Sequence, residues 1–318
     1  MNIKKNHPKL PMQIGVLLAP LLALIGIILQ CTLLLGDYDA SSGYFAGASV
    51  SALIMPAFFI ATAIVLLICT LIIRRCIPPA PDNRGLTVLF SGAFLSVALA
   101  VAALCTALAL PATKDGYLRF ISTVALIGAI SSFIYIALTL RGDRFPTLRA
   151  ALSAAPTVYA MFAAMYLYFD KTMQMNAPVK LLQLVSYLIL ACYSLSECRN
   201  VIGRKKPALN FFTTSLALVF CGVASVPSIV YTAVHNTATV LSVAGDFVLF
   251  AFFLYILARL IQLLPIESPK LHSMVGVILN REEETATEEV LEEEEELEQE
   301  SFDFSEEEPE EKVTEEAE

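Results

Sequence analysis

The residues with the clearest capacity for chemistry are two acids in apolar surroundings. Asp246 lies inside the apolar run VAGDFVL, and Glu197 ends another apolar run, with Arg199 close behind it. An ionisable side chain inside a bilayer costs roughly 2.5–3.5 kcal/mol or more on insertion, so it normally faces the protein interior and binds or pairs there. Asp246 is therefore either a site for a cation or a proton, or a protonated acid hydrogen-bonded to a neighbouring helix.

A stripe of polar side chains at helical spacing within residues 179–198 accompanies Asp246. Such a face turns toward a bundle interior or an aqueous cavity rather than toward lipid. Interior hydrogen bonding and the lining of a cavity both explain it. Together with Asp246, these side chains form the candidate intramembrane polar site: Gln183, Ser186, Tyr187, Tyr193 and Ser194.

Glu197 and Arg259 form a second candidate, an ion pair at the inner ends of their helices. Arg259 follows Asp246 by 13 residues, which corresponds to about 20 Å along a helix axis. Glu197 is expected at the level of Arg259. The two carboxylates are then too far apart for shared acid–base chemistry, whereas Glu197 and Arg259 are within reach of each other.

Signatures of catalysis, metal binding and cofactor binding are missing from the sequence. It holds no HExxH, Walker, GxGxxG or G-x-S-x-G motif. The three histidines are far apart in the sequence, and the seven cysteines include no CxxC pair. We therefore expect no catalytic residue, no metal, no cofactor and no enzymatic activity.

Eight apolar stretches must position these side chains, and each is long enough to cross a bilayer as a helix, which takes about 20 mostly apolar residues. The predicted fold class is all-α: a polytopic transmembrane helix bundle of about eight spans, with a disordered acidic C-terminal tail. The predicted spans are 12–35, 47–73, 86–110, 117–140, 148–169, 179–198, 208–233 and 237–264.

The composition agrees with a membrane protein and argues against other classes. Hydrophobic residues make up 57% of the 318 residues, and charged residues only 16%. Residues 281–318 carry 21 acids and two bases, a formal charge of −19, whereas residues 1–280 carry +10. Such a basic, apolar body is not expected of a soluble enzyme, a nucleic-acid-binding protein or a disulfide-stapled secreted domain.

The basic residues of the short loops predict the orientation. Thirteen Lys and Arg residues fall on the side that holds both termini, and four fall on the opposite side. Cytoplasmic loops carry the excess of basic residues, so both termini are predicted to be cytoplasmic. The expected location is the cell membrane, the inner membrane of a bacterium, with multiple passes.

Prolines inside four predicted spans have two interpretations. Each removes a helical hydrogen bond, so each is either a hinge at a binding site or an ordinary feature of membrane-helix packing. Ordinary packing is favoured, and only Pro227, in GVASVPS, approaches the pattern of a broken helix. The four are Pro20, Pro56, Pro156 and Pro227.

The chain divides into four segments. Residues 1–11 form a basic cytoplasmic N-terminus, and residues 12–264 form the bundle. Residues 265–281 have one apolar helical face, so we expect an amphipathic helix in the membrane interface. Residues 282–318 are rich in glutamate and poor in apolar residues, so we expect disorder. The lipid bilayer is one expected partner; for the tail, the partner is a basic cytoplasmic protein or the chain's own basic inner loops, and nucleic acid is not expected.

Two stretches resemble uncharacterised multi-spanning bacterial inner-membrane proteins. The first is Tyr38-Asp39 followed by Gly43-Tyr44-Phe45, and the second is Glu197-Cys198-Arg199 with Gly203-Arg204 and Pro207. The resemblance implies placement in a bacterial inner membrane and carries no assigned activity.

Two functions follow as hypotheses from these patterns. The leading one is a non-enzymatic accessory, sensor or assembly component that works through its acidic cytoplasmic tail. The alternative is a small-solute or ion transporter that uses Asp246 and the polar face of residues 179–198. A wide aqueous cavity at Asp246 would favour transport, and a close-packed bundle would favour the accessory role.

Overall fold

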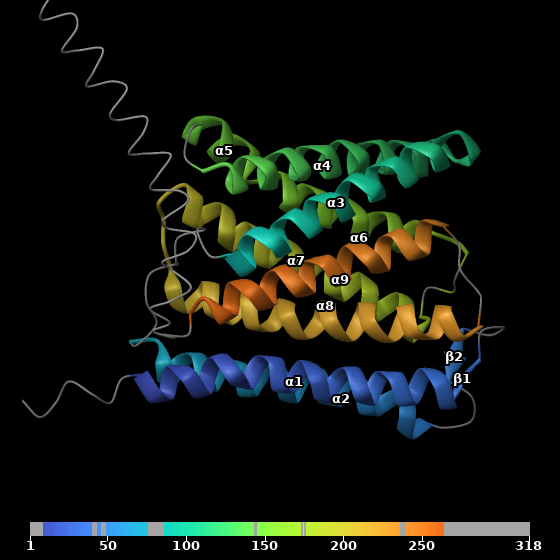
Figure 1. Cartoon of the computed structure of the whole chain (residues 1–318). Coiled ribbons are helices and arrows are strands. Elements are labelled where there is room, and N and C mark those ends of the chain that lie inside the picture. Colours follow the sequence, from blue (N-terminus) through green and yellow to red (C-terminus); the bar gives the residue numbers. More distant parts are fainter. Residues whose placement is uncertain are drawn as a thin grey trace, which may run out of the picture. The chain divides into compact units, whose positions relative to one another are not determined.

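The structure is a computed structural model that describes residues 9–39, 43–45, 49–75, 86–142, 145–172, 174, 176–235 and 240–263. These residues form helices joined by short loops, together with one small hairpin (Figure 1). The elements are α1 (Lys9–Gly36), β1 (Tyr38–Asp39), β2 (Tyr44–Phe45), α2 (Ser49–Ile73), α3 (Leu86–Ala109), η1 (Leu110–Ala112), α4 (Gly116–Leu140), α5 (Pro146–Leu152), α6 (Ala155–Phe169), α7 (Pro178–Val201), α8 (Pro207–His235) and α9 (Val240–Ile261).

The predicted fold class is confirmed: the described residues form a bundle of long apolar helices. Eight helical segments among them are long and apolar enough to cross a membrane. The bounds of these helices lie within a few residues of the predicted ones: the second, α2, begins at Ser49, and the last, α9, runs from Val240 to Ile261. The expected interfacial helix, residues 265–281, and the expected tail, residues 282–318, lie outside the described residues, as do residues 1–8.

Six of the helices form a closed ring. In order around the ring they are α3, α4, α6, α7, α8 and α9, and α9 packs against α3 to close it. The fully buried side chains Leu190, Leu218, Leu249 and Ile256 come from α7, α8 and α9. In this ring α7 and α9 are not adjacent, because α8 lies between them. A contact between α7 and α9 is therefore made by long side chains.

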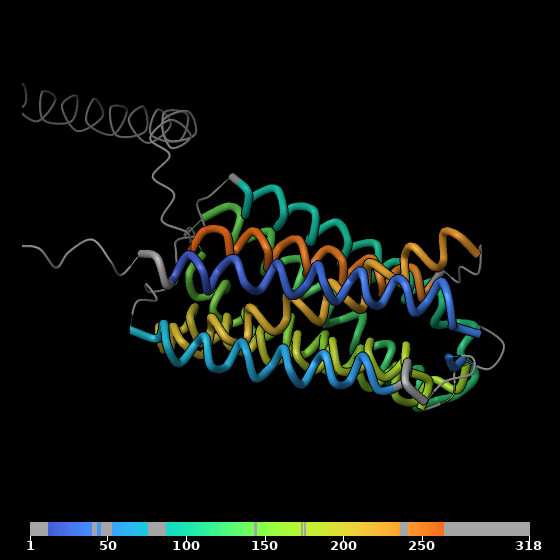
Figure 2. Tube along the Cα trace, turned by 90° about the horizontal axis from the view of Figure 1, so that it is seen from below, coloured from blue at the N-terminus to red at the C-terminus, as the bar shows by residue number. Residues whose placement is uncertain are grey.

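Helices α1 and α2 lie outside the ring. α1 packs along α8, and α2 contacts both α1 and α8, so the pair covers one flank (Figure 1). The helix axes are roughly parallel to one another, and the loops lie at the two ends of the bundle (Figure 2). The start of α1 and the end of α9 lie at the same end, here called the N-terminal end; the opposite end, which holds β1 and β2, is the hairpin end. An even number of spans requires this arrangement.

The fifth span is divided into two helices at Pro156. α5 ends at Leu152, and α6 begins at Ala155. Proline has no N–H to donate, and its ring collides with the carbonyl four residues earlier, here that of Leu152, so the regular helix ends there. Ser153 occupies the break, with its Oγ 3.2 Å from Cys198 Sγ of α7.

The other three prolines lie inside continuous helices. Pro20 is in α1, Pro56 in α2 and Pro227 in α8. The sequence pointed to Pro227 as the nearest to a broken helix, but the break falls at Pro156. α5 has only seven residues and lies at the N-terminal end, next to α4 and α7, so the interruption is remote from Asp246.

A two-stranded hairpin covers part of the hairpin end. Tyr38 pairs with Phe45 in the antiparallel register, and the rings of these residues meet edge to face at 5.8 Å. Tyr38 also meets Tyr231 of α8 edge to face, with ring centroids 5.3 Å apart. Gly43 in the turn has φ of 76°, a left-handed conformation that glycine adopts without the Cβ penalty. The aromatic contacts thus attach the hairpin to α8.

Candidate functional site

Asp246 is joined to two neighbouring helices by hydrogen bonds. Gln183 Nε2 of α7 donates to Asp246 Oδ1 at 2.7 Å, and Ser228 Oγ of α8 donates to Asp246 Oδ2 at 2.5 Å. Asp246 itself is only 4% exposed, whereas Gln183 and Ser228 are half-buried. We call these three residues the Asp246 cluster. It links α7, α8 and α9 at a single carboxyl group.

The depth of Asp246 follows from the start of α9. The helix begins at Val240, six residues before Asp246, which places the carboxyl group about 9 Å along the helix from its hairpin end. The sequence placed Asp246 near the middle of the membrane, because the last span was expected to begin at residue 237. The cluster therefore lies in the half of the bundle nearer the hairpin end.

Two more polar side chains of α7 make contacts beside the cluster. Tyr187 Oη donates to the backbone carbonyl of Gly245 at 3.2 Å. Ser186 Oγ lies 2.7 Å from Leu182 O in its own helix and 3.1 Å from Phe220 O of α8. Tyr187 thus adds a second link from α7 to α9, and Ser186 a link from α7 to α8.

The described helices that pack against Asp246 place hardly any charge near it. The helices next to α9 in the ring, α3 and α8, have no Asp, Glu, Lys or Arg in their sequences. On α7, the charged residue nearest in sequence to Gln183 is Lys180, which is buried and donates to the backbone carbonyl of Asp170. The hydrogen bonds to Asp246 come from an amide and a hydroxyl, both neutral.

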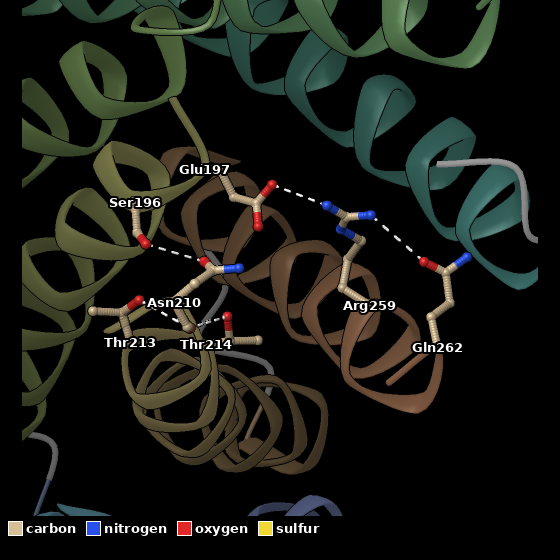
Figure 3. Close-up of polar contacts among 7 residues, drawn as sticks. All are labelled: Ser196, Glu197, Asn210, Thr213, Thr214, Arg259 and Gln262. Carbon is tan, nitrogen blue, oxygen red and sulfur yellow. Dashed lines mark hydrogen bonds and ion pairs between the residues drawn. The ribbon is translucent and has the colours of Figure 1, made fainter. Parts of the chain in front are cut away.

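Glu197 and Arg259 form an ion pair nearer the N-terminal end (Figure 3). Arg259 Nη2 lies 3.0 Å from Glu197 Oε2, and the two side chains are 8% and 16% exposed. Arg259 Nη1 lies 3.5 Å from Gln262 Oε1, a long contact within the same helix. The pair reaches from α9 to α7 and so spans two helices that are not adjacent in the ring.

Ser196 and Asn210 add a hydrogen bond next to this pair. Ser196 Oγ and Asn210 Oδ1 are 3.0 Å apart, which ties α7 to α8 at the same end (Figure 3). Thr213 and Thr214 turn their hydroxyls back to the carbonyl of Asn210. The hydroxyls of these threonines thus bond to the backbone of their own helix.

The polar stripe predicted on α7 divides into two groups. Gln183, Ser186 and Tyr187 lie near Asp246, whereas Tyr193 and Ser194 lie on the other side of the fully buried Leu190, toward Glu197. The hydroxyls of Tyr193 and Ser194 are buried and have no hydrogen-bond partner among the described residues, and the same is true of Ser215 on α8. The stripe is therefore not one continuous site.

Ser228 is the member of the Asp246 cluster that sequence reasoning missed. Ser228 follows Pro227, and a serine in a membrane helix usually bonds back to its own helix, as Ser225 does to the Cys221 carbonyl at 2.6 Å. One weak signal in the sequence is that Ser228 carries a hydroxyl near the C-terminal end of the span that directly follows the polar span, residues 179–198.

Comparison with known proteins adds no relative: no family model, no curated protein and no solved structure matches the chain. Among the described residues, no group of three or more His, Cys, Asp or Glu side chains is placed to hold a metal ion. The polar contacts inside the helix ring are therefore the features from which function has to be inferred.

Proposed function

We propose that the chain is a non-enzymatic component of the cell membrane that acts as an accessory, sensor or assembly protein. In this proposal both termini are cytoplasmic, and the acidic residues 282–318 contact a basic cytoplasmic protein or the basic inner loops of the chain itself. The observation that supports it is that the interior polar groups bond to one another between helices. Gln183 and Ser228 bond to Asp246, and Glu197 pairs with Arg259. These groups hold helices to one another, as expected of a bundle that serves as a platform.

The acidic segment supplies the recognition chemistry of this proposal. Its formal charge of −19 attracts a basic surface, and each exposed pair contributes about 0–1 kcal/mol, so binding depends on many weak contacts. Salt weakens such contacts, since the screening length falls from about 10 Å at 0.1 M to about 3 Å at 1 M. A partner held in this way is released by salt.

An affinity pull-down from membranes tests the proposal. The full chain is compared with a chain that ends at residue 280 and with a full-length chain whose tail glutamates are all glutamine, which keeps the length but removes the charge. We expect a basic cytoplasmic protein to copurify with the full chain alone and to elute with salt. Equal recovery of the same proteins with all three chains would contradict the proposal.

Transport of a small solute or ion is the second candidate, and one observation favours it. Asp246 is a buried carboxyl group whose hydrogen-bond donors among the described residues are both neutral, and intramembrane acids of this kind commonly mark ion or substrate pathways. Uptake into liposomes that contain the wild type or Asp246→Asn tests this candidate. We expect uptake of the transported ion or solute with the wild type only, and equal uptake by the two chains excludes a role for Asp246.

A further inference from the structure

We propose that the Asp246 cluster binds a small monovalent cation, Na⁺ for example, in exchange for a proton. Asp246 holds either one proton or one monovalent cation, and the side chains around it come from α7, α8 and α9. This inference goes beyond the accessory role, and in the transport alternative it names the class of ion. The experiment below measures cation binding alone, so its outcome is independent of the outcomes of the pull-down and uptake experiments.

The first step is the charge of Asp246. The carboxyl group is buried, and its hydrogen-bond partners among the described residues, Gln183 and Ser228, are neutral. An ionised carboxylate in such surroundings without a compensating positive charge is strongly unfavourable. Arg259 and Lys180, the buried basic residues of the described part, contact Glu197 and the Asp170 carbonyl. Asp246 must therefore hold either a proton or a cation.

The second step is the set of oxygen atoms around this carboxyl group. Asp246 offers two carboxylate oxygens, Ser228 a hydroxyl and Gln183 an amide oxygen. The amide of Gln183 can rotate by half a turn, which presents its oxygen in place of its NH₂ group, and the hydroxyl of Ser228 can rotate to accept or to donate. Oxygen ligands of this kind suit a hard cation.

The same side chains also suit a proton. When Asp246 is protonated, its O–H donates to Ser228 Oγ or to the rotated amide oxygen of Gln183. When a cation is bound, both of these groups turn their oxygen atoms toward it. Rotation of the two side chains, together with a small separation of the three groups, thus converts the proton-bound arrangement into the cation-bound one.

The third step is the valence and size of the cation. One carboxylate neutralises one positive charge, so a divalent ion would leave a net charge buried in the bundle. Ca²⁺ takes six to eight oxygen ligands, and Mg²⁺ usually keeps several waters. The Asp246 cluster has one acid, and its carboxyl oxygens lie 2.7 Å from Gln183 Nε2 and 2.5 Å from Ser228 Oγ. The charge and the few oxygen atoms of this set therefore favour a small monovalent ion.

Few other titratable groups are near enough to compete for the proton. Tyr187, on the facing side of α7, donates to Gly245 beside Asp246, and its ring contacts Tyr159 of α6. The remaining titratable groups on α8 and α3 are Cys221, Tyr231, His235 and Cys105, and α1, which touches α9 only slightly, adds Cys31 and Lys9. In the described part of the chain, Asp246 hydrogen-bonds to Gln183 and Ser228 and to none of these groups, so the exchange is centred on one carboxyl group.

Labelling with dicyclohexylcarbodiimide tests the proposal on the full chain in lipid nanodiscs. A protonated carboxyl group adds across the carbodiimide and rearranges to a stable N-acylurea, whereas an ionised or cation-bound carboxylate does not react. Mass spectrometry of the peptide that contains Asp246 measures the adduct. We expect labelling to fall about tenfold in NaCl, relative to choline chloride of equal ionic strength, once Na⁺ is at about ten times its dissociation constant.

Three variants make the test specific. Asp246→Asn should abolish the adduct at this peptide, and Ser228→Ala should retain labelling but weaken the protection by Na⁺. Ser225→Ala is the matched control, because Ser225 lies one turn away on α8 and bonds only to its own helix; it should behave as the wild type does. Na⁺ should also raise the unfolding temperature of the wild type but not that of Asp246→Asn.

Two results would overturn the proposal. Labelling of Asp246 that is equal in Na⁺ and choline would show a carboxyl group that holds only a proton, with a purely structural role. Absence of labelling in both salts, together with no effect of Na⁺ on the unfolding temperature, would show that the carboxyl group exchanges neither species.

Discussion

Arg259 Nη2 lies 3.0 Å from Glu197 Oε2, and this contact joins α9 to α7 although the two helices are not adjacent in the ring. Gln183 and Asp246 join the same two helices nearer the hairpin end. The fully buried Leu190 lies between the two links on α7. Two polar contacts at different depths therefore restrain α7 and α9 against tilting relative to each other.

The ion pair predicts a large loss of stability when one partner is removed. Glu197→Ala leaves the buried guanidinium of Arg259 without its carboxylate, and breaking a buried pair costs about 3–5 kcal/mol. The double variant Glu197→Ala/Arg259→Met should lose less than the sum of the single variants. Unfolding in detergent, followed by circular dichroism, measures both. Arg199→Ala, two residues farther along α7, is the control, and equal losses for Glu197→Ala and Arg199→Ala would contradict the prediction.

Gly128 predicts a second stability effect, at the contact of α4 with α6. A Cβ at Gly128 would lie 3.0 Å from Tyr159 Cα and 3.1 Å from Tyr159 N, so backbone atoms would have to move. Overpacking of this kind costs about 1–3 kcal/mol. Gly116→Ala, at the start of the same helix, is the control, because its Cβ would meet nothing within 4 Å. If Gly128→Ala unfolds at the same temperature as Gly116→Ala, the close approach of α4 and α6 is wrong.

The sequence predicted the spans well because bilayer thickness imposes a length and an apolar composition on every membrane helix. It could not predict the ring, since the order of helices around it depends on which surfaces fit. The break before Pro156 is a related case: four spans contain proline, and only packing decides where the helix bends and where it ends. Local composition thus predicts elements but not their neighbours.

The candidate site was predicted only in part, because the sequence shows which side chains are polar but not which of them meet across helices. Asp246 and Gln183 stood out as polar residues in apolar spans, and the structure places them 2.7 Å apart. Ser228 did not stand out, because serine is common in membrane helices and usually bonds to its own backbone. Tyr193 and Ser194 stood out equally but lie in the other half of the bundle. Helical spacing shows which side chains share a face, not which ones meet across helices.

The hairpin predicts a change at alkaline pH. Burial, and to a lesser extent the nearby Tyr231 and Asp39, raises the pKa of Tyr38 above the ordinary tyrosine value. Because the folded state holds this proton more tightly than the unfolded state, the docked hairpin keeps its full stability below the ordinary value and loses it as the pH rises toward the raised pKa. Ultraviolet absorbance of tyrosinate, compared between wild type and Tyr38→Phe, should show one tyrosine that ionises late. A Tyr38→Phe difference spectrum that titrates as an ordinary exposed tyrosine would contradict this prediction.

The last prediction concerns the orientation of the bundle. Lys171 and Lys205 are both exposed, and they lie in the loops before and after α7. A helix of 24 residues separates these loops, a length of about 36 Å, enough to cross the hydrocarbon core. With the excess of basic residues on the cytoplasmic side, Lys205 is expected inside and Lys171 outside. In a background without native cysteines, a membrane-impermeant maleimide applied to intact cells should label Lys171→Cys, and should label Lys205→Cys only after the membrane is permeabilised. Labelling of Lys205→Cys from outside would reverse the orientation, and labelling of both from outside would mean that α7 does not cross the membrane.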